Sequence, residues 1–241
     1  MKQRANYGID APGVFFAHVI LGPLLALTAV LALALPNLIP AWVSIGAAAV
    51  AALVLFYAAV MLWSSLVGKK RVRDRLVAAL ALSGTERVLD AGCGLGLALI
   101  GCAKKLTTGK AVGIDLWAAK DLSNNNPAAT LANAAAEGVA DRVEVETGDI
   151  TKLPFAVSSF DAVISMTVLH NIPSRDLRDQ ALRELVRVLK PGGRIALFDL
   201  LHASRYAEVL RQAGMEVRVL GRDFLWGLPC RSLLAQKPGL H

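Results

Sequence analysis

VLDAGCGLGLALI, residues 88–100, is the stretch that decides the fold. An apolar pair ends in Asp90, and three glycines then occupy alternate positions from 92 to 96. Residues 97–106 have a helical composition, so the order predicts a strand, a glycine turn and a helix. This arrangement brings backbone close to a nucleotide-like ligand at a helix N-terminus. Glycine is needed because the turn must adopt positive φ and present no Cβ to the ligand.

The spacing of the glycines distinguishes between two classes of ligand. A dinucleotide-binding turn, G-x-G-x-x-G, would need glycine at position 97 or 99, and both positions hold leucine. The pattern D-x-G-x-G-x-G, from Asp90 to Gly96, instead resembles the first motif of the class I S-adenosylmethionine (SAM)-dependent methyltransferases. The resemblance implies SAM as the cofactor, and an NAD-dependent oxidoreductase is the weaker alternative.

Four further blocks follow in an order and spacing similar to that family: VGIDLW (112–117), VEVETGDITKLPF (143–155), FDAVISMTVLHNI (160–172) and LVRVLKPGGRIALFDL (185–200). The last block is a helix end near residue 190, a Pro-Gly-Gly turn and a strand over 193–199. The resemblance covers about residues 71–236 and is closest to the small-molecule branch that includes ubiquinone/menaquinone-type methyltransferases. Alternating helices and strands predict an α/β fold, with a Rossmann-like, doubly wound and mostly parallel seven-stranded sheet. The resemblance adds that the last strand is antiparallel.

The resemblance implies a cofactor role for the glycine turn and its flanks. Gly92, Gly94 and Gly96 would lie under the methionine portion and the adenosine sugar of SAM. Backbone N–H groups at the start of the following helix would receive the carboxylate of SAM. Asp90, at the tip of the first strand, would interact with the amino end. Cys93 sits inside the glycine turn, where a small side chain fits; it is predicted to contact the cofactor through its place in the turn and is given no chemistry.

The other cofactor residues follow the later strands. Asp115, at the tip of the second strand, can accept both ribose hydroxyls of an adenosyl group, with Leu116 packing on the adenine. Asp149 would accept the adenine amino group, with Ile150 against the ring. The alternative for Asp149 is an ordinary turn aspartate. Met166, at the end of the fourth strand, would approach the methionine tail.

The acceptor side of the site is less marked. A base is needed only where the methyl acceptor must lose a proton; His170, in LHNI after the fourth strand, is the candidate catalytic base, and the alternative is a histidine that shapes the pocket wall. His202 is a weaker candidate. No Asn-Pro-Pro-Tyr follows the fourth strand, which argues against nucleic-acid or protein amides as acceptors. Phe224, Trp226 and Leu228 either line an apolar pocket or pack under the sheet.

The chain is unusually apolar for an α/β protein. Of its 241 residues 55% are hydrophobic, the mean hydropathy is +0.50, and the excess lies at the front. Residues 14–35 and 41–63 are apolar runs, each long enough at 1.5 Å per residue to cross a hydrocarbon core of about 30 Å. With the uncharged break between them, they predict a transmembrane hairpin within residues 1–68, followed by a methyltransferase domain over 69–241.

Basic residues flank this hairpin on both sides. Lys2 and Arg4 precede it, residues 69–75 carry five positive charges, and the connecting loop has none. The positive-inside rule therefore places both ends, and the catalytic domain, on the cytoplasmic side of the cell membrane. The 69–75 cluster also favours anionic lipid headgroups. Two alternatives are a signal peptide cleaved near 32–34 and a pair of buried core helices.

Charge and cysteine content argue against two further classes of protein. The net charge is +7 and the pI is near 9.6, but no nucleic-acid recognition motif is present. Three cysteines form an odd number without C-x-x-C spacing, so no zinc or other metal site and no disulfide is indicated.

The sequence therefore predicts a membrane-anchored SAM-dependent methyltransferase that acts on a small, lipophilic acceptor, with membrane lipids as further partners. It does not choose between carbon, oxygen, nitrogen and sulfur as the acceptor atom, and it does not predict an oligomeric state. A membrane-tethered SAM-binding sensor or scaffold without catalysis is the alternative from another functional class.

Overall fold

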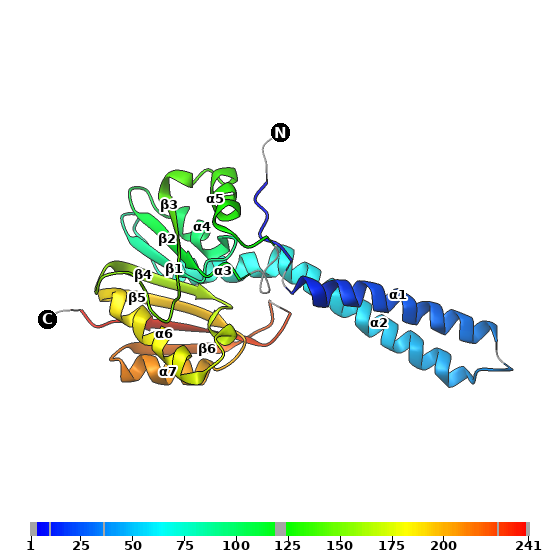
Figure 1. Ribbon diagram of the computed structural model, residues 1–241. Coiled ribbons are helices and arrows are strands. Elements are labelled where there is room, and N and C mark those ends of the chain that lie inside the picture. The colour runs from blue at the N-terminus through cyan, green and yellow to red at the C-terminus, as the bar shows by residue number, and fades with distance from the viewer. Residues whose placement is uncertain (1–3, 10, 36, 119–123, 226, 240–241) are drawn as a thin grey trace.

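The computed structural model describes residues 4–9, 11–35, 37–118, 124–225 and 227–239. An α/β domain carries a long pair of antiparallel helices that projects from one side (Figure 1). Those helices are α1, Pro12–Ala34, and α2, Ala41–Trp63. Their bounds lie within two residues of the apolar runs in the sequence, because each helix extends over one such run.

The two helices have the length and composition of membrane-spanning helices, and little of their surface is covered. Only 11% of the most apolar window of each is buried, whereas a core helix would be mostly buried. The buried positions are all small: Gly22, Ala29 and Ala32 on α1, and Ser44, Ala51 and Ala58, seven residues apart, on α2. A Cβ at Gly22 would lie 2.5 Å from Leu55 Cδ2. Small residues therefore allow the close approach of the helices.

The second helix continues into the domain without a break. After α2, a π-helical segment, Ser64–Gly68, leads directly into α3, Lys69–Ala79. The Lys69 side chain is buried, and its ammonium donates to the carbonyl oxygens of Tyr7 at 2.9 Å and Gly8 at 2.7 Å. The residues before α1 and the residues after α2 are thus joined to each other at the base of the hairpin.

The sheet has the order β3-β2-β1-β4-β5-β7-β6. Its strands are β1 Arg87–Ala91, β2 Lys110–Asp115, β3 Val143–Thr147, β4 Phe160–Met166, β5 Leu189–Asp199, β6 Glu216–Asp223 and β7 Cys230–Gln236. The first five strands pair in parallel, and β7 is antiparallel to both β5 and β6. The prediction of a mostly parallel seven-stranded α/β sheet with an antiparallel last strand is confirmed.

Helices cover both faces of the sheet (Figure 1). One apolar core contains α3 together with α4, Leu97–Ala103, and α5, Pro127–Ala136. The other contains α6, Arg175–Val188, and α7, Ala203–Gln212. Helices α3, α4 and α5 therefore lie on one face of the sheet, and α6 and α7 lie on the other. The carboxyl ends of the central strands lie between these two layers of helices.

The Pro-Gly-Gly sequence differs from its predicted role. The prediction placed it as a turn before a strand beginning at 193, but α6 ends at Val188 and β5 begins at the next residue. The register shifts between the pairs Phe160–Leu189 and Ala162–Arg194. Gly192 has φ +77°, and its N–H donates to the Lys237 carbonyl at 3.0 Å. The glycines therefore form a bulge within the strand, because Gly192 can adopt a left-handed conformation there.

Gly113 in β2 provides a test of how tightly the sheet packs on the glycine turn. A Cβ there would lie 2.7 Å from Cys93 Sγ and 2.8 Å from Leu99 Cδ2. We expect Gly113→Ala to lower the free energy of unfolding by about 1–3 kcal/mol, the scale of overpacking. Gly221→Ala in β6 is the matched control, since its Cβ would meet nothing within 4 Å. Chemical denaturation of the purified full chain measures both, and equal stability of the two variants would contradict the packing argument.

Candidate active site

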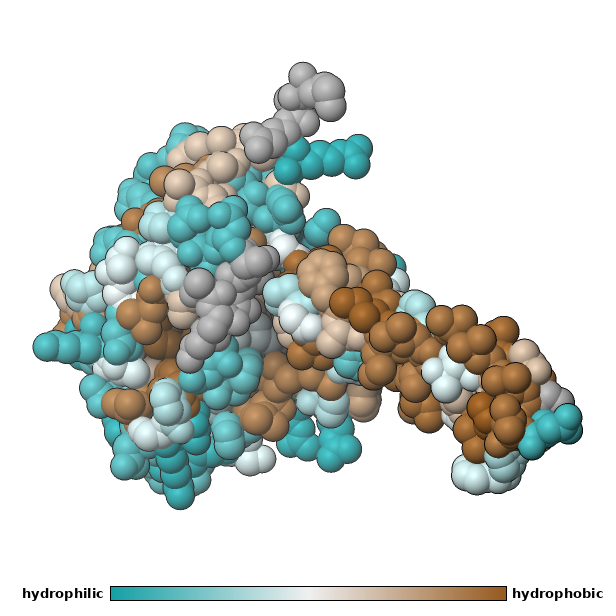
Figure 2. Space-filling model, turned by 45° about the vertical axis from the view of Figure 1, so that its right-hand side comes forward, coloured by the Kyte–Doolittle hydropathy of each residue, from teal (hydrophilic) through white to brown (hydrophobic). Residues whose placement is uncertain are grey.

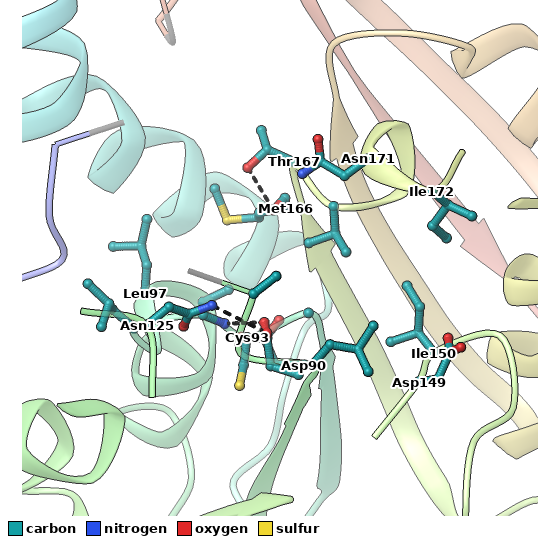
Figure 3. Close-up of a pocket in the computed structure, with 18 of the residues that line it drawn as sticks. Asp90, Cys93, Leu97, Asn125, Asp149, Ile150, Met166, Thr167, Asn171 and Ile172 are labelled. Carbon is teal, nitrogen blue, oxygen red and sulfur yellow. Dashed lines mark hydrogen bonds between the residues drawn. The ribbon is translucent and has the colours of Figure 1, made fainter. Parts of the chain in front are cut away.

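A cavity of about 390 Å³ opens at the carboxyl ends of β1, β2 and β4. This is the point at which the strand order reverses, between β1 and β4, and such switch points are where open α/β sheets bind ligands. Figure 3 shows its walls, with Asp90 and Cys93 on one side, Asp149 and Ile150 on another, and Met166 and Thr167 above. Of the ten residues predicted to contact the cofactor, nine line this cavity, and Gly96 does not.

The glycine turn has the conformation that its sequence predicts. Gly92, Gly94 and Gly96 have φ of +79°, +49° and +84°. A Cβ at Gly92 would lie 2.4 Å from Val168 Cγ1, so no larger residue fits there. Gly96 is the N-cap of α4 and lies beneath the cavity wall. The turn therefore presents backbone at the N-terminus of α4, which favours an anionic group of a ligand.

Asp90 is buried, and its carboxylate supports the first turn of α4. Its Oδ2 accepts the N–H of Leu99 at 2.7 Å. Burial raises the pKa of Asp90 to about 7, the nearby Asp115 adds to the increase, and the bond from Leu99 opposes it. A carboxyl with this pKa can be held in either protonation state by a ligand near neutral pH.

Asp115 joins the glycine turn to the end of β2. Its Oδ2 accepts the Gly94 N–H at 2.8 Å, and its Oδ1 accepts the Trp117 N–H at 2.7 Å. The Asn125 side-chain amide also reaches Oδ1, at 3.4 Å. Oδ1 therefore has two donors, whereas Oδ2 has one and keeps a second lone pair, which can accept from a hydroxyl group in the cavity. Asn125 also lines the cavity, and among the described residues no partner reaches its buried Oδ1.

The remaining predicted cofactor residues form the opposite wall. Asp149 Oδ1 accepts the Thr151 N–H at 2.8 Å, so this aspartate stabilises its own turn while facing the cavity. Ile150 and Met166 are buried apolar residues of the wall, and the exposed Leu116 lies at its rim.

Cys93 lines the cavity but packs inward. Its sulfur is the nearest atom to a hypothetical Cβ on Gly113, and burial raises the pKa of its thiol well above the ordinary range. The thiol is therefore neutral and fills space between the glycine turn and β2.

The residues just before the hairpin form a wall of the cavity that sequence reasoning missed. We call residues 5–9 the strap. Tyr7 of the strap and Lys69 both line the cavity. Asn133 of α5 accepts the Asn6 N–H and donates to the Asn6 carbonyl, each at 2.9 Å. The same Asn133 amide donates to the Leu95 carbonyl in the glycine turn at 2.9 Å, so one side chain connects the strap to that turn.

A polar side chain on the buried face of an alanine-rich helix was the one available signal for this wall. Asn133 is such a residue in α5, and it is buried. Thr130, one turn earlier, donates from its hydroxyl to the Gly94 carbonyl at 2.7 Å. The side chain that holds the strap therefore belongs to a helix that also holds the glycine turn.

His170 lies beside the cavity and is paired with a buried carboxylate. It belongs to a short 3₁₀ turn, Leu169–Asn171. Its Nδ1 donates to Asp199 Oδ1 at 2.5 Å, its backbone N–H donates to Asp199 Oδ2 at 3.0 Å, and the Tyr206 hydroxyl donates to Oδ2 at 3.3 Å. Because a carboxylate only accepts, this pairing places the proton of neutral imidazole on Nδ1 and leaves Nε2 as an acceptor.

His170 is not among the residues that line the cavity, so neither of its two predicted roles, as a base or in the pocket wall, has a direct contact with the cavity. Residues on either side of it, Val168 and Asn171, line the cavity instead. Thr167, with φ +54°, lines it as well. His202 is the N-cap of α7 and lies outside the lining.

Two of the three aromatic and apolar candidates near the C-terminus are also placed elsewhere. Phe224 is 62% exposed and Leu228 is 38% exposed, and neither lines the cavity. They belong to the loop between β6 and β7, which packs against the base of α2. Trp226 lies outside the described residues. The interpretation of Phe224 and Leu228 as pocket walls or as packing under the sheet is therefore wrong.

Known proteins resemble this chain in sequence. Residues 89–197 match the family model described as a methyltransferase domain. The 27-O-demethylrifamycin SV methyltransferase of Amycolatopsis mediterranei is 37% identical over 134 residues, covering 54% of this chain and 44% of that protein. The demethylmenaquinone methyltransferase of Lactiplantibacillus plantarum is 35% identical over 130 residues, covering 53% and 50%. This chain thus spans about half the length of the curated relatives it matches.

Solved structures share the fold. The [4+2]-cyclase SpnF has a TM-score of 0.59 at 22% identity, covering 71% of this chain and 81% of that chain. A SAM dependent methyltransferase from Aquifex aeolicus has a TM-score of 0.55 at 21% identity, covering 68% and 88%. The family model over residues 89–197, the curated relatives and the strand order agree, so this chain contains a methyltransferase domain that resembles the class I SAM-dependent methyltransferases.

Proposed function

We propose that this protein is a membrane-anchored methyltransferase that transfers the methyl group of SAM to a small, lipophilic acceptor. The observation that carries the proposal is the composition of one cavity. The glycine turn and Asp115 form one side of it, and Tyr7 and Lys69, at the base of the apolar hairpin, form another. A site of this composition brings cofactor-binding groups to the place where the chain meets the membrane.

The residues present fit SAM as the cofactor. The N-terminus of α4 suits its carboxylate, Asp90 its ammonium, Asp115 its ribose hydroxyls and Asp149 its adenine amino group. Val168 packs against the bare backbone of Gly92 in the cavity wall, so only glycine fits at this position. When bound, SAM supplies a methyl group already activated on a sulfonium, so the protein's own task is alignment and exclusion of water.

The acceptor end of the cavity supports a lipophilic substrate. Ile172, Pro173 and Leu177 form its outer wall, with Val168 nearer the glycine turn. Thr167 and Asn171 are the polar groups of that end, and polar groups of this kind orient a ligand in an apolar pocket. The printed names of two relatives, which are methyltransferases for a rifamycin and for a menaquinone precursor, support a small-molecule acceptor.

His170 is proposed to act as the general base for an acceptor that must lose a proton. Asp199 accepts one hydrogen bond from the imidazole Nδ1–H and one from the His170 backbone N–H; the first fixes the tautomer and leaves Nε2 to receive the proton. Because His170 is outside the cavity lining, the acceptor must extend past Asn171 to reach it.

Membrane anchoring is proposed through α1 and α2, with both ends on the cytoplasmic side. The basic cluster at 69–75 supports this orientation. In the structure, however, three of its five positive charges are buried or paired with a carboxylate. Lys69 is buried, while Arg73 pairs with Asp74 and Arg75 with Asp223. Lys70 and Arg71 are exposed and form no ion pair within the described part of the chain, so these two are the members best placed to meet lipid headgroups.

Asp115→Ala tests the cofactor site. We expect it to weaken SAM binding by about 1–3 kcal/mol, the cost of leaving buried polar partners unpaired, because the N–H groups of Gly94 and Trp117 lose their acceptor as well. Titration calorimetry on the full chain measures this, with Asp141→Ala, an exposed carboxylate, as the matched control. An absence of heat with SAM together with binding of NADH would favour an oxidoreductase instead.

His170→Ala tests the base. Turnover should fall by about 10²–10⁴-fold while SAM affinity changes little, and Asp199→Asn should alter the pH profile of turnover because it disturbs the tautomer. His202→Ala, outside the cavity, is the control and should retain activity. Labelled SAM with lipid and small-molecule extracts supplies the assay. If SAM binds but no extract is methylated, and SAM changes the association of a partner instead, the chain is a SAM-binding sensor or scaffold.

Reporter fusions test the hairpin. A reporter inserted at Asn37 should respond as a non-cytoplasmic group and one at the C-terminus as a cytoplasmic group, because two spans return the chain to its starting side. The protein should also stay with membranes in a carbonate wash. A cytoplasmic signal from Asn37, or release of the full chain by carbonate, rejects the hairpin.

A further inference from the structure

The loop between β6 and β7 reaches the last turn of α2. A Cβ on Gly227 would lie 3.2 Å from Val60 Cγ1 and 3.8 Å from Ser64 Cβ. A Cβ on Gly68 would lie 1.8 Å from the Leu225 carbonyl oxygen and 3.3 Å from the Trp63 ring. Val60 is three residues before the end of α2 at Trp63, about 4.5 Å along a helix axis. The loop thus extends alongside the apolar helix itself.

Several contacts hold this loop against the helix. Asp223, at the end of β6, pairs with Arg75 of α3. The other Asp223 oxygen, Oδ1, accepts the Leu225 N–H at 2.8 Å and forms the first bend of the loop. Gly68 and Gly227 permit backbone approach at the two points described above. These contacts therefore fix the position of the loop along the axis of α2, beside its last turn.

Apolar side chains are exposed on the loop and at the end of α2. Phe224 is 62% exposed and Leu228 is 38% exposed, and Trp63 at the end of α2 is 41% exposed. The Arg71 guanidinium lies 5.9 Å from the centroid of the Trp63 ring. We call Phe224, Leu228 and Trp63 the tip surface. Figure 2 shows brown, apolar surface continuing from the hairpin onto the part of the domain where the hairpin joins it.

Two arginines flank the tip surface on the adjoining strands. Arg222 of β6 and Arg231 of β7 are direct cross-strand partners, and like charges in that position are destabilising unless an anion lies between or beside them. In the described part of the chain neither arginine is in an ion pair. The carboxylate of Asp199, the neighbour of Arg231 on β5, is buried and bonded to His170 and Tyr206.

We propose that the tip surface is a second membrane contact, in which Phe224 and Leu228 enter the interfacial zone of the bilayer beside α2 while Arg222 and Arg231 bind anionic phospholipid headgroups. The proposal rests on the membrane anchoring proposed above. Aromatic and apolar groups with adjacent arginines suit this zone, where a ring meets acyl chains and a guanidinium meets phosphate. Because the loop is fixed to the helix, insertion of α2 carries the tip surface to the interface.

Site-specific fluorescence on the full chain in nanodiscs tests the proposal. An environment-sensitive dye is attached to Phe224→Cys, with Leu228→Cys as a second variant should the first fold poorly. The native cysteines are buried, and labelling of the unsubstituted chain gives the blank. Val157→Cys, 65% exposed at the amino end of β4, is the aqueous control. Leu53→Cys, 67% exposed within α2, is the bilayer control.

The dye at 224 or 228 should be quenched by lipids that carry a shallow nitroxide, and its quenching by aqueous iodide should be several-fold weaker than at 157. If the dye at 53 is lipid-quenched but those at 224 and 228 behave like the one at 157, the second contact is rejected while the hairpin stands. If the dye at 53 is also quenched by iodide rather than by lipid, the anchoring itself fails, and the inference falls with it.

Headgroup charge tests the arginines separately. Protection of the dye at 224 from iodide should increase when phosphatidylglycerol is added to phosphatidylcholine nanodiscs. The double variant Arg222→Gln and Arg231→Gln should lose that increase, while Arg218→Gln, an exposed arginine on the same strand, should keep it. Protection that appears only at high protein-to-nanodisc ratios would indicate contact between two copies of the chain and would overturn the lipid assignment.

Discussion

One buried ammonium joins the parts of this molecule. Lys69 lies where the long second helix enters the domain, and it donates to two carbonyls of the strap that precedes the first helix. A buried lysine destabilises the fold unless its charge is hydrogen-bonded. Detachment of the strap would therefore leave the Lys69 ammonium buried without these two acceptors. Because the same lysine lines the cavity, the hairpin base, the strap and the candidate active site share one structural support.

The features predicted from sequence are those that short segments determine. The glycine turn requires positive φ at alternate positions, and the apolar runs before Asp90 and Asp115 require buried strands, so both were visible from residue order. The strap was not, because its partners lie 62 and 127 residues away and its own sequence has no marked pattern. His170 was identified by its place after a strand, but its pairing with Asp199, 29 residues on, depends on how β4 and β5 align.

The hairpin shows the same division. The length of each apolar run was enough to locate both helices, because a helix satisfies its backbone hydrogen bonds within itself. The faces through which the two helices contact each other could not be predicted from the sequence, because alanine is so frequent there that small residues recur at many different spacings. In the structure the buried positions of α2 are Ser44, Ala51 and Ala58, seven residues apart, and this spacing keeps them on one side of the helix as a narrow seam.

The attachment of the hairpin to the domain also explains why most side chains of the 69–75 cluster are bonded to other protein groups. A charge that fixes geometry must be paired with protein, and Lys69, Arg73 and Arg75 are each bonded to it. Charges that meet lipid must instead stay exposed, and Lys70 and Arg71 do so at the start of α3. Residues 69–75 therefore divide between side chains that attach the helix to the domain and side chains that stay exposed, as the proposed membrane contact requires. The helical period sets this division, since it turns successive residues toward different surroundings.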